Sequence, residues 1–249
     1  MMTEIIPDWQ LPPGVNRGLW DYLHSGEMVA GYDWQMALSP LAAVDVEFCA
    51  RHFPKPGRLI DLGCGTGRVA RHFAPLGFDY LGVDLSDEML AKAREHAPAT
   101  AAFQKANLVD LDGLADGSFD WACSLFSTLG MIRGEDNRRL ALLAARRVLK
   151  PGGALVLHVH NRGFHGLGWK RFRTGDLTMP QAYGGAPLTL YHYSRREIVR
   201  LVTAAGFEIE TVAPVGRGTG GHLKWSWLFP GIRSYGYLLA ARKPALTAM

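Results

Sequence analysis

The 249-residue sequence has few cysteines, no block of one charge and no long apolar run. Its three cysteines, Cys49, Cys64 and Cys123, are odd in number and lack the CxxC spacing of a zinc or redox site. Such cysteines are typical of a protein in a reducing compartment. No apolar stretch approaches the roughly 18 residues that cross a bilayer, and the first residues lack a basic region followed by an apolar core. These absences predict a cytoplasmic protein without a membrane segment or secretion signal.

Charge is nearly balanced, because 27 Lys and Arg residues stand against 23 Asp and Glu, for a net charge of +4. The basic residues form no run, so nucleic acid is not an expected partner. Arg171 and Arg173 flank Phe172 as in some RNA-binding surfaces, which keeps an RNA or protein substrate as an alternative. None of the nine histidines has HxxxH or HExxH spacing, so no metal site is expected.

From Gly57 to about residue 160, short apolar runs alternate with helical stretches, a pattern typical of a parallel sheet covered by helices on both faces. The length fits one large α/β domain. Strands are expected at residues 58–63, 80–84, 100–107, 119–126, 154–160, 207–212 and 235–240. The sequence thus predicts a doubly wound α/β fold with a seven-stranded, mostly parallel sheet.

Two flanking segments carry less pattern. Residues 1–56 are rich in aromatics without one clear period, and we expect an N-terminal helical cap that packs as a single compact unit with the main domain at 57–249. Residues 161–193 are rich in Gly, Arg and aromatics, with no helix or strand period over 162–188, and are expected to be an insertion over the active face. Ser194 and Glu197 then form the capping box of a helix over residues 194–205.

A glycine-rich turn, DLGCGTG at residues 61–67, joins the first strand to the first helix and leaves a bare surface for a ligand. Asp84 ends the second strand 17 residues after Gly67, where a carboxylate can accept hydrogen bonds from both hydroxyls of a ribose. Asp61 stands directly before the turn and would repel a pyrophosphate. The pair favours a nucleoside cofactor without phosphates and with an ammonium or sulfonium charge, which makes a nicotinamide oxidoreductase a distant alternative.

Three segments, LIDLGCGTGR at 59–68, GVDLSDEM at 82–89 and LKPGG at 149–153, resemble the class I S-adenosylmethionine-dependent methyltransferases and occur in family order. The resemblance covers about residues 57–160 and extends to the helix at 194–205 and the last strand. It implies a Rossmann-like methyltransferase fold with an antiparallel last strand. It also implies S-adenosylmethionine as cofactor and S-adenosylhomocysteine as product.

The resemblance also implies the cofactor contacts. Gly63, Gly65 and Gly67 would pack against the methionine part, Asp84 would hold the ribose, Leu85 and Met89 would flank adenine, and Ser124 and Leu125 would lie beside the amino acid end. The segment Ala106-Asn107-Leu108 stands where the family usually has Gly-Asp-Leu or Gly-Asp-Ala, so Asn107 takes the place of the acid and Leu108 follows it. Asn107 keeps an acceptor for the adenine amino group and gains a donor for the ring nitrogen. Cys64 is expected to be a small side chain that packs in the turn. A catalytic thiol is not needed, because in methyl transfer the acceptor is itself the nucleophile.

Two interpretations are open for the role of each of four further aromatic and histidine side chains. Tyr22 and Tyr32 either close over the sulfonium by cation-π attraction or simply pack the cap. His160 and His192 are candidate general bases, with His160 favoured because it ends a central strand, but a histidine satisfied by backbone groups is the alternative.

The sequence after the fourth strand lacks an Asn-Pro-Pro-Tyr type of motif, which argues against a nucleobase substrate. Our hypothesis is that the protein transfers a methyl group from S-adenosylmethionine to a small-molecule acceptor. The alternatives are an RNA or protein methyltransferase and a non-catalytic S-adenosylmethionine-binding module.

Overall fold

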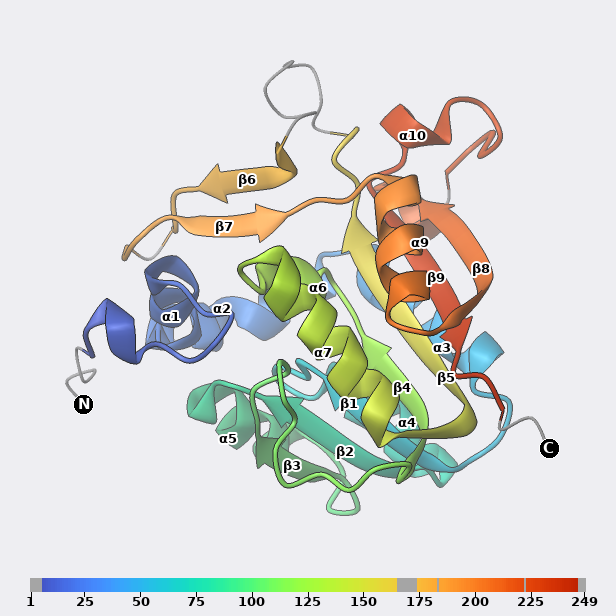
Figure 1. The fold of residues 1–249 in the computed structure, drawn as a ribbon. Coiled ribbons are helices and arrows are strands. Elements are labelled where there is room, and N and C mark those ends of the chain that lie inside the picture. The colour runs from blue at the N-terminus through green and yellow to red at the C-terminus, as the bar shows by residue number, and fades with distance from the viewer. Residues whose placement is uncertain (1–5, 165–173, 183, 222, 246–249) are drawn as a thin grey trace.

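A computed structural model describes residues 6–164, 174–182, 184–221 and 223–245 (Figure 1). Its main sheet has the strand order β3-β2-β1-β4-β5-β9-β8. The strands are β1 Arg58–Leu62, β2 Asp79–Asp84, β3 Ala102–Lys105, β4 Phe119–Ser124, β5 Leu149–His160, β8 Glu208–Val215 and β9 Gly236–Arg242. β1 to β5 pair in parallel, and β9 is antiparallel to both β5 and β8. The predicted seven-stranded, mostly parallel sheet with an antiparallel last strand is confirmed.

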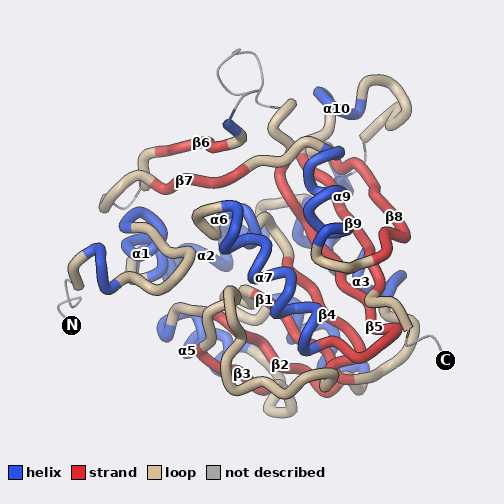
Figure 2. Tube along the Cα trace, viewed as in Figure 1, coloured by secondary structure: helices blue, strands red, loops and turns tan. Residues whose placement is uncertain are grey.

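Helices cover both faces of this sheet (Figure 2). The helices are α1 Arg17–Leu23, α2 Gly26–Ala37, α3 Leu41–His52, α4 Arg68–Phe73, α5 Asp87–His96, α6 Thr128–Met131, α7 Glu135–Val148, α9 Arg195–Ala204 and α10 Pro230–Arg233. Apolar side chains of α3 and α4 pack in one core, and those of α7 and α9 pack in the core on the other face. Because the strand order reverses between β1 and β4, a crevice for ligands opens at the carboxyl ends of these strands.

The predicted helix starts are visible in the hydrogen bonds. The Ser86 hydroxyl accepts from the Met89 amide at 3.2 Å at the start of α5. Ser194 and Glu197 form the expected reciprocal capping box at the start of α9. Each bond satisfies an amide of the first turn that has no partner within the helix.

The 161–193 insertion, whose sequence shows no helix or strand period over 162–188, contains two short strands. β6 Asp176–Met179 and β7 Leu188–Tyr191 form a two-stranded antiparallel sheet of their own. Strands of four residues place only two side chains on each face, which is too few to show an alternating period. The Arg171 to Arg173 segment lies outside the described residues.

This hairpin and α1 form a roof above the carboxyl ends of the main sheet (Figure 1). The Gln181 side chain donates to the Gly18 carbonyl at 2.8 Å, and the Ala186 amide donates to the Asp21 carboxylate at 2.8 Å. A Cβ on Gly18 would lie 2.1 Å from the Pro187 carbonyl oxygen, so only glycine allows this close approach. α3 differs from α1 because it packs on the sheet, and the boundary of the cap at residue 56 stays a prediction.

In the part of the chain that the structure describes, none of the helices combines the length and apolar character needed to cross a bilayer.

Candidate functional site

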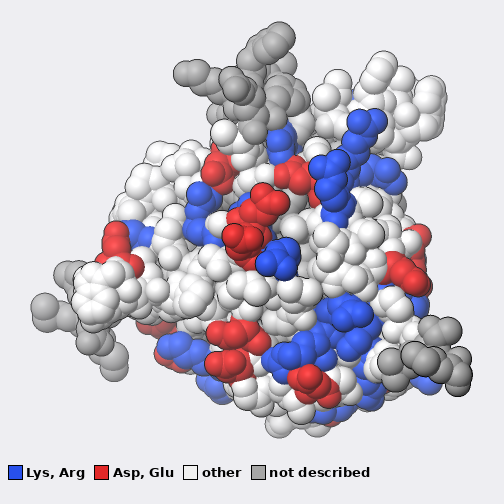
Figure 3. All heavy atoms as spheres, in the orientation of Figure 1, with Lys and Arg blue, Asp and Glu red and all other residues white. Residues whose placement is uncertain are grey.

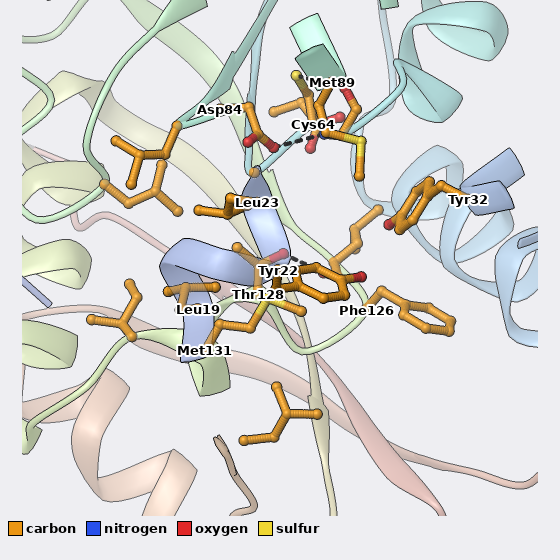
Figure 4. Close-up of a pocket in the computed structure, with 18 of the residues that line it drawn as sticks. Leu19, Tyr22, Leu23, Tyr32, Cys64, Asp84, Met89, Phe126, Thr128 and Met131 are labelled. Atoms are coloured by element: carbon orange, nitrogen blue, oxygen red, sulfur yellow. Dashed lines mark hydrogen bonds between the residues drawn. The ribbon is translucent and has the colours of Figure 1, made fainter. Parts of the chain in front are cut away.

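A cavity of about 330 Å³ lies between the roof and the carboxyl ends of β1, β2 and β4 (Figure 4). Thirteen of the sixteen predicted site residues line it. They are Tyr22, Tyr32, Asp61, Gly63, Cys64, Gly65, Asp84, Leu85, Met89, Asn107, Leu108, Leu125 and His160. Its size is within the usual range for a small-molecule site.

The glycine turn presents bare backbone to this cavity. Gly63, Gly65 and Gly67 all have left-handed backbone conformations, with φ of +82°, +53° and +78°. The amides of Gly63 and Cys64 both donate to the Val83 carbonyl, at 2.8 and 3.0 Å, which ties the turn to the end of β2. A Cβ on Gly65 would lie 3.4 Å from the Tyr32 ring. The left-handed backbone therefore favours glycine at this position, and a Cβ there would contact the Tyr32 ring.

Asp84 is held in place by backbone amides. One carboxylate oxygen accepts from the Gly65 amide at 2.9 Å, and the other accepts from the Ser86 amide at 3.0 Å. Burial raises the pKa of Asp84, while these amides act in the opposite direction. Each oxygen keeps a further lone pair, so the carboxylate can still accept from two ligand hydroxyls.

Asp61 is a buried acid below the turn. Its carboxylate accepts from the Tyr80 hydroxyl at 2.7 Å and from the Cys123 thiol at 3.4 Å. Burial raises the pKa of Asp61 to about 6, although the Tyr80 hydrogen bond and the nearby Arg68 both lower it. A ligand ammonium beside this carboxyl would favour its charged form. The site therefore suits a cation.

Asn107 has a role that the sequence did not reveal. Its side-chain amide donates to the Pro13 carbonyl at 2.9 Å, and its oxygen accepts from the Val109 amide at 3.1 Å. This amide group ties the N-terminal segment to the loop after β3 and keeps one further N–H, so the expected donation to an adenine ring nitrogen stays a prediction. The oxygen keeps one lone pair for the amino group of a ligand.

Three predicted site residues do not line the cavity. Gly67 precedes α4, and a Cβ there would meet Ala93 and Phe103 at 3.3 Å. Ser124 faces the layer of α7, where it lines a small space with Leu142. Ser124 points away because neighbouring residues of a strand face opposite sides of the sheet.

His192 is the third, and it is buried behind His160 with the two ring centres 5.3 Å apart. His160 itself lines the cavity, with Tyr235 and Phe126 around it at ring distances of 4.7 and 6.0 Å. Phe126 has a left-handed backbone with φ of +53°, an uncommon conformation for an aromatic residue, in the turn after β4. The cavity thus has an aromatic end beyond the glycine turn.

His158, two residues before His160, is part of the buried core instead. Its Nδ1 lies 2.7 Å from an Asp45 carboxylate oxygen, and both side chains are fully buried. The Arg68 guanidinium lies 3.1 Å from the other oxygen of Asp45. This network fixes α3 against the sheet and the start of α4. Within the described residues, no three His, Cys, Asp or Glu side chains are grouped to hold a metal ion.

Sequence reasoning missed much of the cavity wall. The missed residues include Gly14, Leu19, Leu23, Gln35, Met36, Arg68, Phe126, Thr128, Met131, Leu188, Leu190 and Tyr235. Phe126 and Thr128 could have been found, because they directly follow the carboxyl end of a central strand. Leu188 and Leu190 carry no such signal, since only the folding of the hairpin brings them to the site.

Comparison with known proteins gives a consistent result. Residues 60–157 match a family described as a methyltransferase domain. YqeM of Bacillus subtilis is 33% identical over 110 residues, which cover 43% of this chain and 44% of YqeM. A ubiquinone biosynthesis O-methyltransferase of Methylococcus capsulatus is 30% identical over 51% of this chain and 52% of its own length. The chain therefore spans about half the length of these curated relatives.

A likeness in fold extends over more of the chain. It superposes on a Burkholderia thailandensis 1,6-didemethyltoxoflavin-N1-methyltransferase with a TM-score of 0.65 at 18% identity, covering 94% of this chain and 93% of that one. That structure holds 1,6-didemethyltoxoflavin and S-adenosylhomocysteine. The matched domain, the strand order and the three motifs agree, and residues 60–157 of this chain form a methyltransferase domain of the class I S-adenosylmethionine-dependent type.

Proposed function

We propose that this chain transfers a methyl group from S-adenosylmethionine to a small-molecule acceptor. The observation that carries this proposal is one continuous cavity, which runs from the glycine turn and two buried carboxylates to a roofed aromatic end containing His160. Relatives named for methylation of ubiquinone precursors and of a toxoflavin precursor support a small acceptor. On the face drawn in Figure 3, basic and acidic side chains are interspersed, which is unlike a surface that follows a nucleic acid.

In this proposal Asp61 and Asp84 bind different parts of the cofactor. Asp61 accepts from the ammonium, and Asp84 accepts from the ribose hydroxyls. Leu85 and Met89 lie beside the adenine, and the bare turn at Gly63 and Gly65 lets the methionine part approach the backbone.

Tyr32 packs against Gly65 and lines the same cavity, so its ring can lie near the sulfonium. Burial raises the pKa of Tyr32, which keeps its hydroxyl neutral at all ordinary pH values. Cation-π attraction in such an enclosed place contributes up to about 2 kcal/mol. Tyr22 lies on α1 at the centre of the cavity in Figure 4 and would cover the cofactor from the roof.

S-adenosylmethionine supplies an activated methyl group, which an acceptor atom attacks in line as the bond from methyl to sulfur breaks. The protein aligns the two partners and keeps water out by means of the roof. His160 lies at the acceptor end, where one ring nitrogen can take the proton that a hydroxyl or ammonium acceptor loses. His192 packs behind His160 and orients its ring rather than touching the acceptor.

Two measurements test the proposal. Calorimetry should show micromolar binding of S-adenosylhomocysteine and none of NAD. Incubation of the protein with methyl-labelled S-adenosylmethionine and a fractionated cell extract should then place the label in molecules of low mass. Label in RNA or protein, with transfer that falls steeply as salt rises, would support the alternative acceptors. Binding of S-adenosylhomocysteine without methyl transfer to any fraction would indicate a non-catalytic S-adenosylmethionine-binding module. Binding of NAD alone would overturn the proposal that the chain is a methyltransferase.

A further inference from the structure

A second cavity adjoins the acceptor end of the first. Its volume is about 340 Å³, and four side chains line both cavities: Gln35, Met36, Phe126 and Tyr235. The rest of its wall consists of Leu38, Ser39, Pro40, Leu41 and Arg217. Because the two spaces meet at Phe126 and Tyr235, an acceptor lying on these rings extends from His160 into the second cavity.

Among the described residues that line this second space, Arg217 is the only one with a side chain charged at neutral pH. The first cavity contains one other arginine, Arg68, whose charge is already compensated by Asp45 at 3.1 Å. Within the described ranges, no carboxylate forms an ion pair with Arg217 and no hydrogen bond to its guanidinium is present. The sequence after Glu210 contains no Asp or Glu at all. The guanidinium of Arg217 is therefore an uncompensated positive charge at the edge of a space that apolar and aromatic side chains line together with the neutral polar residues Gln35 and Ser39.

Tyr235 connects this charge to the reacting end. Its ring centre lies 4.7 Å from the ring of His160, and the Arg217 guanidinium carbon lies over the same ring at 5.4 Å. The position of the guanidinium over an aromatic face holds its plane and leaves its N–H edge free to form two parallel hydrogen bonds with a carboxylate. His160 and Arg217 thus stand at two ends of one aromatic surface.

We infer that the acceptor has an aromatic or apolar body and a carboxylate at the end remote from the methylated atom, and that Arg217 binds this carboxylate. The inference rests on the proposed function, since it takes the His160 end of the cavity as the place of methyl transfer. Phe126 and Tyr235 bind the body of the acceptor, and the positive charge selects acids over their neutral analogues.

The test uses two small aromatic acids, indole-3-acetate and 4-hydroxyphenylacetate, each compared with its carboxamide. Their dissociation constants are measured by ligand-observed NMR, on the full chain with and without saturating S-adenosylhomocysteine. We expect each acid to bind about tenfold more tightly than its amide, as for a hydrogen bond to a charged group. Arg217→Gln should abolish this preference and Arg217→Lys should keep part of it. Lys224→Gln, which removes the same charge from an exposed residue of the same segment, should leave it intact.

The outcomes separate the two proposals. Binding of S-adenosylhomocysteine with no preference for acids, or a preference that survives Arg217→Gln, overturns the role of Arg217 and leaves the proposed function standing. An equal loss in Lys224→Gln also overturns it, because the effect would then be one of net charge. Failure of the protein to bind S-adenosylhomocysteine overturns the proposed function and this inference with it.

Discussion

The two ends of the cavity are built in different ways. At the cofactor end, Gly65 lies in the turn after β1 and Asp84 ends the neighbouring parallel strand β2, and one hydrogen bond of 2.9 Å joins them. At the roof, Asp21 of α1 is hydrogen-bonded to Ala186, which is 165 residues away in the chain. The cofactor end is built from backbone and buried acids of adjacent strands and turns, whereas the roof forms where segments far apart in the sequence pack together. Substitutions at the Asp21 and Ala186 contact should therefore alter the roof and leave the hydrogen bond between Gly65 and Asp84 in place.

The largest expected effect separates chemistry from cofactor binding. His160→Gln removes the proposed proton acceptor from the aromatic end and leaves Asp61 and Asp84 untouched. With an acceptor that loses a proton, we expect kcat to fall about a hundredfold or more, while the affinity for S-adenosylhomocysteine changes less than about threefold. Transfer of labelled methyl and calorimetry measure the two quantities. An unchanged kcat across the pH range would show that transfer needs no base.

The cofactor end should depend most strongly on Asp84. Asp84→Ala removes the two proposed hydrogen bonds to the ribose and leaves the amides of Gly65 and Ser86 without their acceptor. Hydrogen bonds to a charged group contribute about 1.5 to 3 kcal/mol each, so the affinity for S-adenosylhomocysteine should fall at least about a hundredfold. Calorimetry measures it, and circular dichroism checks that the variant is folded. An affinity close to that of the unaltered chain would contradict the assigned ribose contact.

Asp61 should make cofactor binding depend on pH. Its pKa is raised to about 6 by burial, and a ligand ammonium favours the ionised form. The affinity for S-adenosylhomocysteine should therefore fall as pH drops through 6, by at most about tenfold per pH unit. Asp61→Asn should bind weakly at pH 8 and lose this dependence. Calorimetry at pH 5 to 8 would contradict the assignment if both proteins gave the same curve.

The same pKa shift acts in the opposite sense on the protein without ligand. A carboxyl whose pKa is raised by folding takes up a proton more readily in the folded state than in the unfolded state. Ionised Asp61 therefore destabilises the ligand-free fold as pH rises above about 4, and this loss is complete above about 6. Asp61→Asn should raise Tm at pH 8 while it weakens binding. A lower Tm would mean that the Tyr80 hydrogen bond outweighs burial.

Steric fit in the roof gives the next prediction. Gly18→Ala places a methyl group 2.1 Å from the Pro187 carbonyl oxygen, so α1 and the hairpin must separate. Overpacking of this kind costs about 1 to 3 kcal/mol, and Tm should fall accordingly. Gly26→Ala in α2 is the matched control, because a Cβ there meets nothing within 4 Å and alanine favours a helix. Equal effects of the two substitutions on Tm would show that α1 and the hairpin are not in close contact.

The contrast between the two ends also explains what could be predicted from the sequence. The turn around Gly63 and the acid Asp84 follow from local rules, since strand ends and left-handed glycines are visible in a short stretch of chain. The position of Asn107 after the third strand predicts a hydrogen bond with adenine. Its hydrogen bond to the Pro13 carbonyl could not be inferred, because the two residues are 94 positions apart in the chain. Leu188 was missed for the same reason, because its place in the cavity depends on how the hairpin meets α1.

The smallest effect is expected at Cys64, which lines the same cavity as Asp84 but whose thiol forms its hydrogen bond within its own turn. Its thiol donates weakly to the Gly65 carbonyl, with the sulfur 3.7 Å from the oxygen. Burial raises the pKa of this thiol, with Asp84 and Asp61 adding to the effect, so it stays protonated and is a poor nucleophile. Cys64→Ala should change the affinity for S-adenosylhomocysteine by less than about threefold, because only a weak contact is lost. A much larger loss, measured by the same calorimetry, would mean that the thiol contacts the cofactor and that the cofactor end depends on more than backbone and carboxylates.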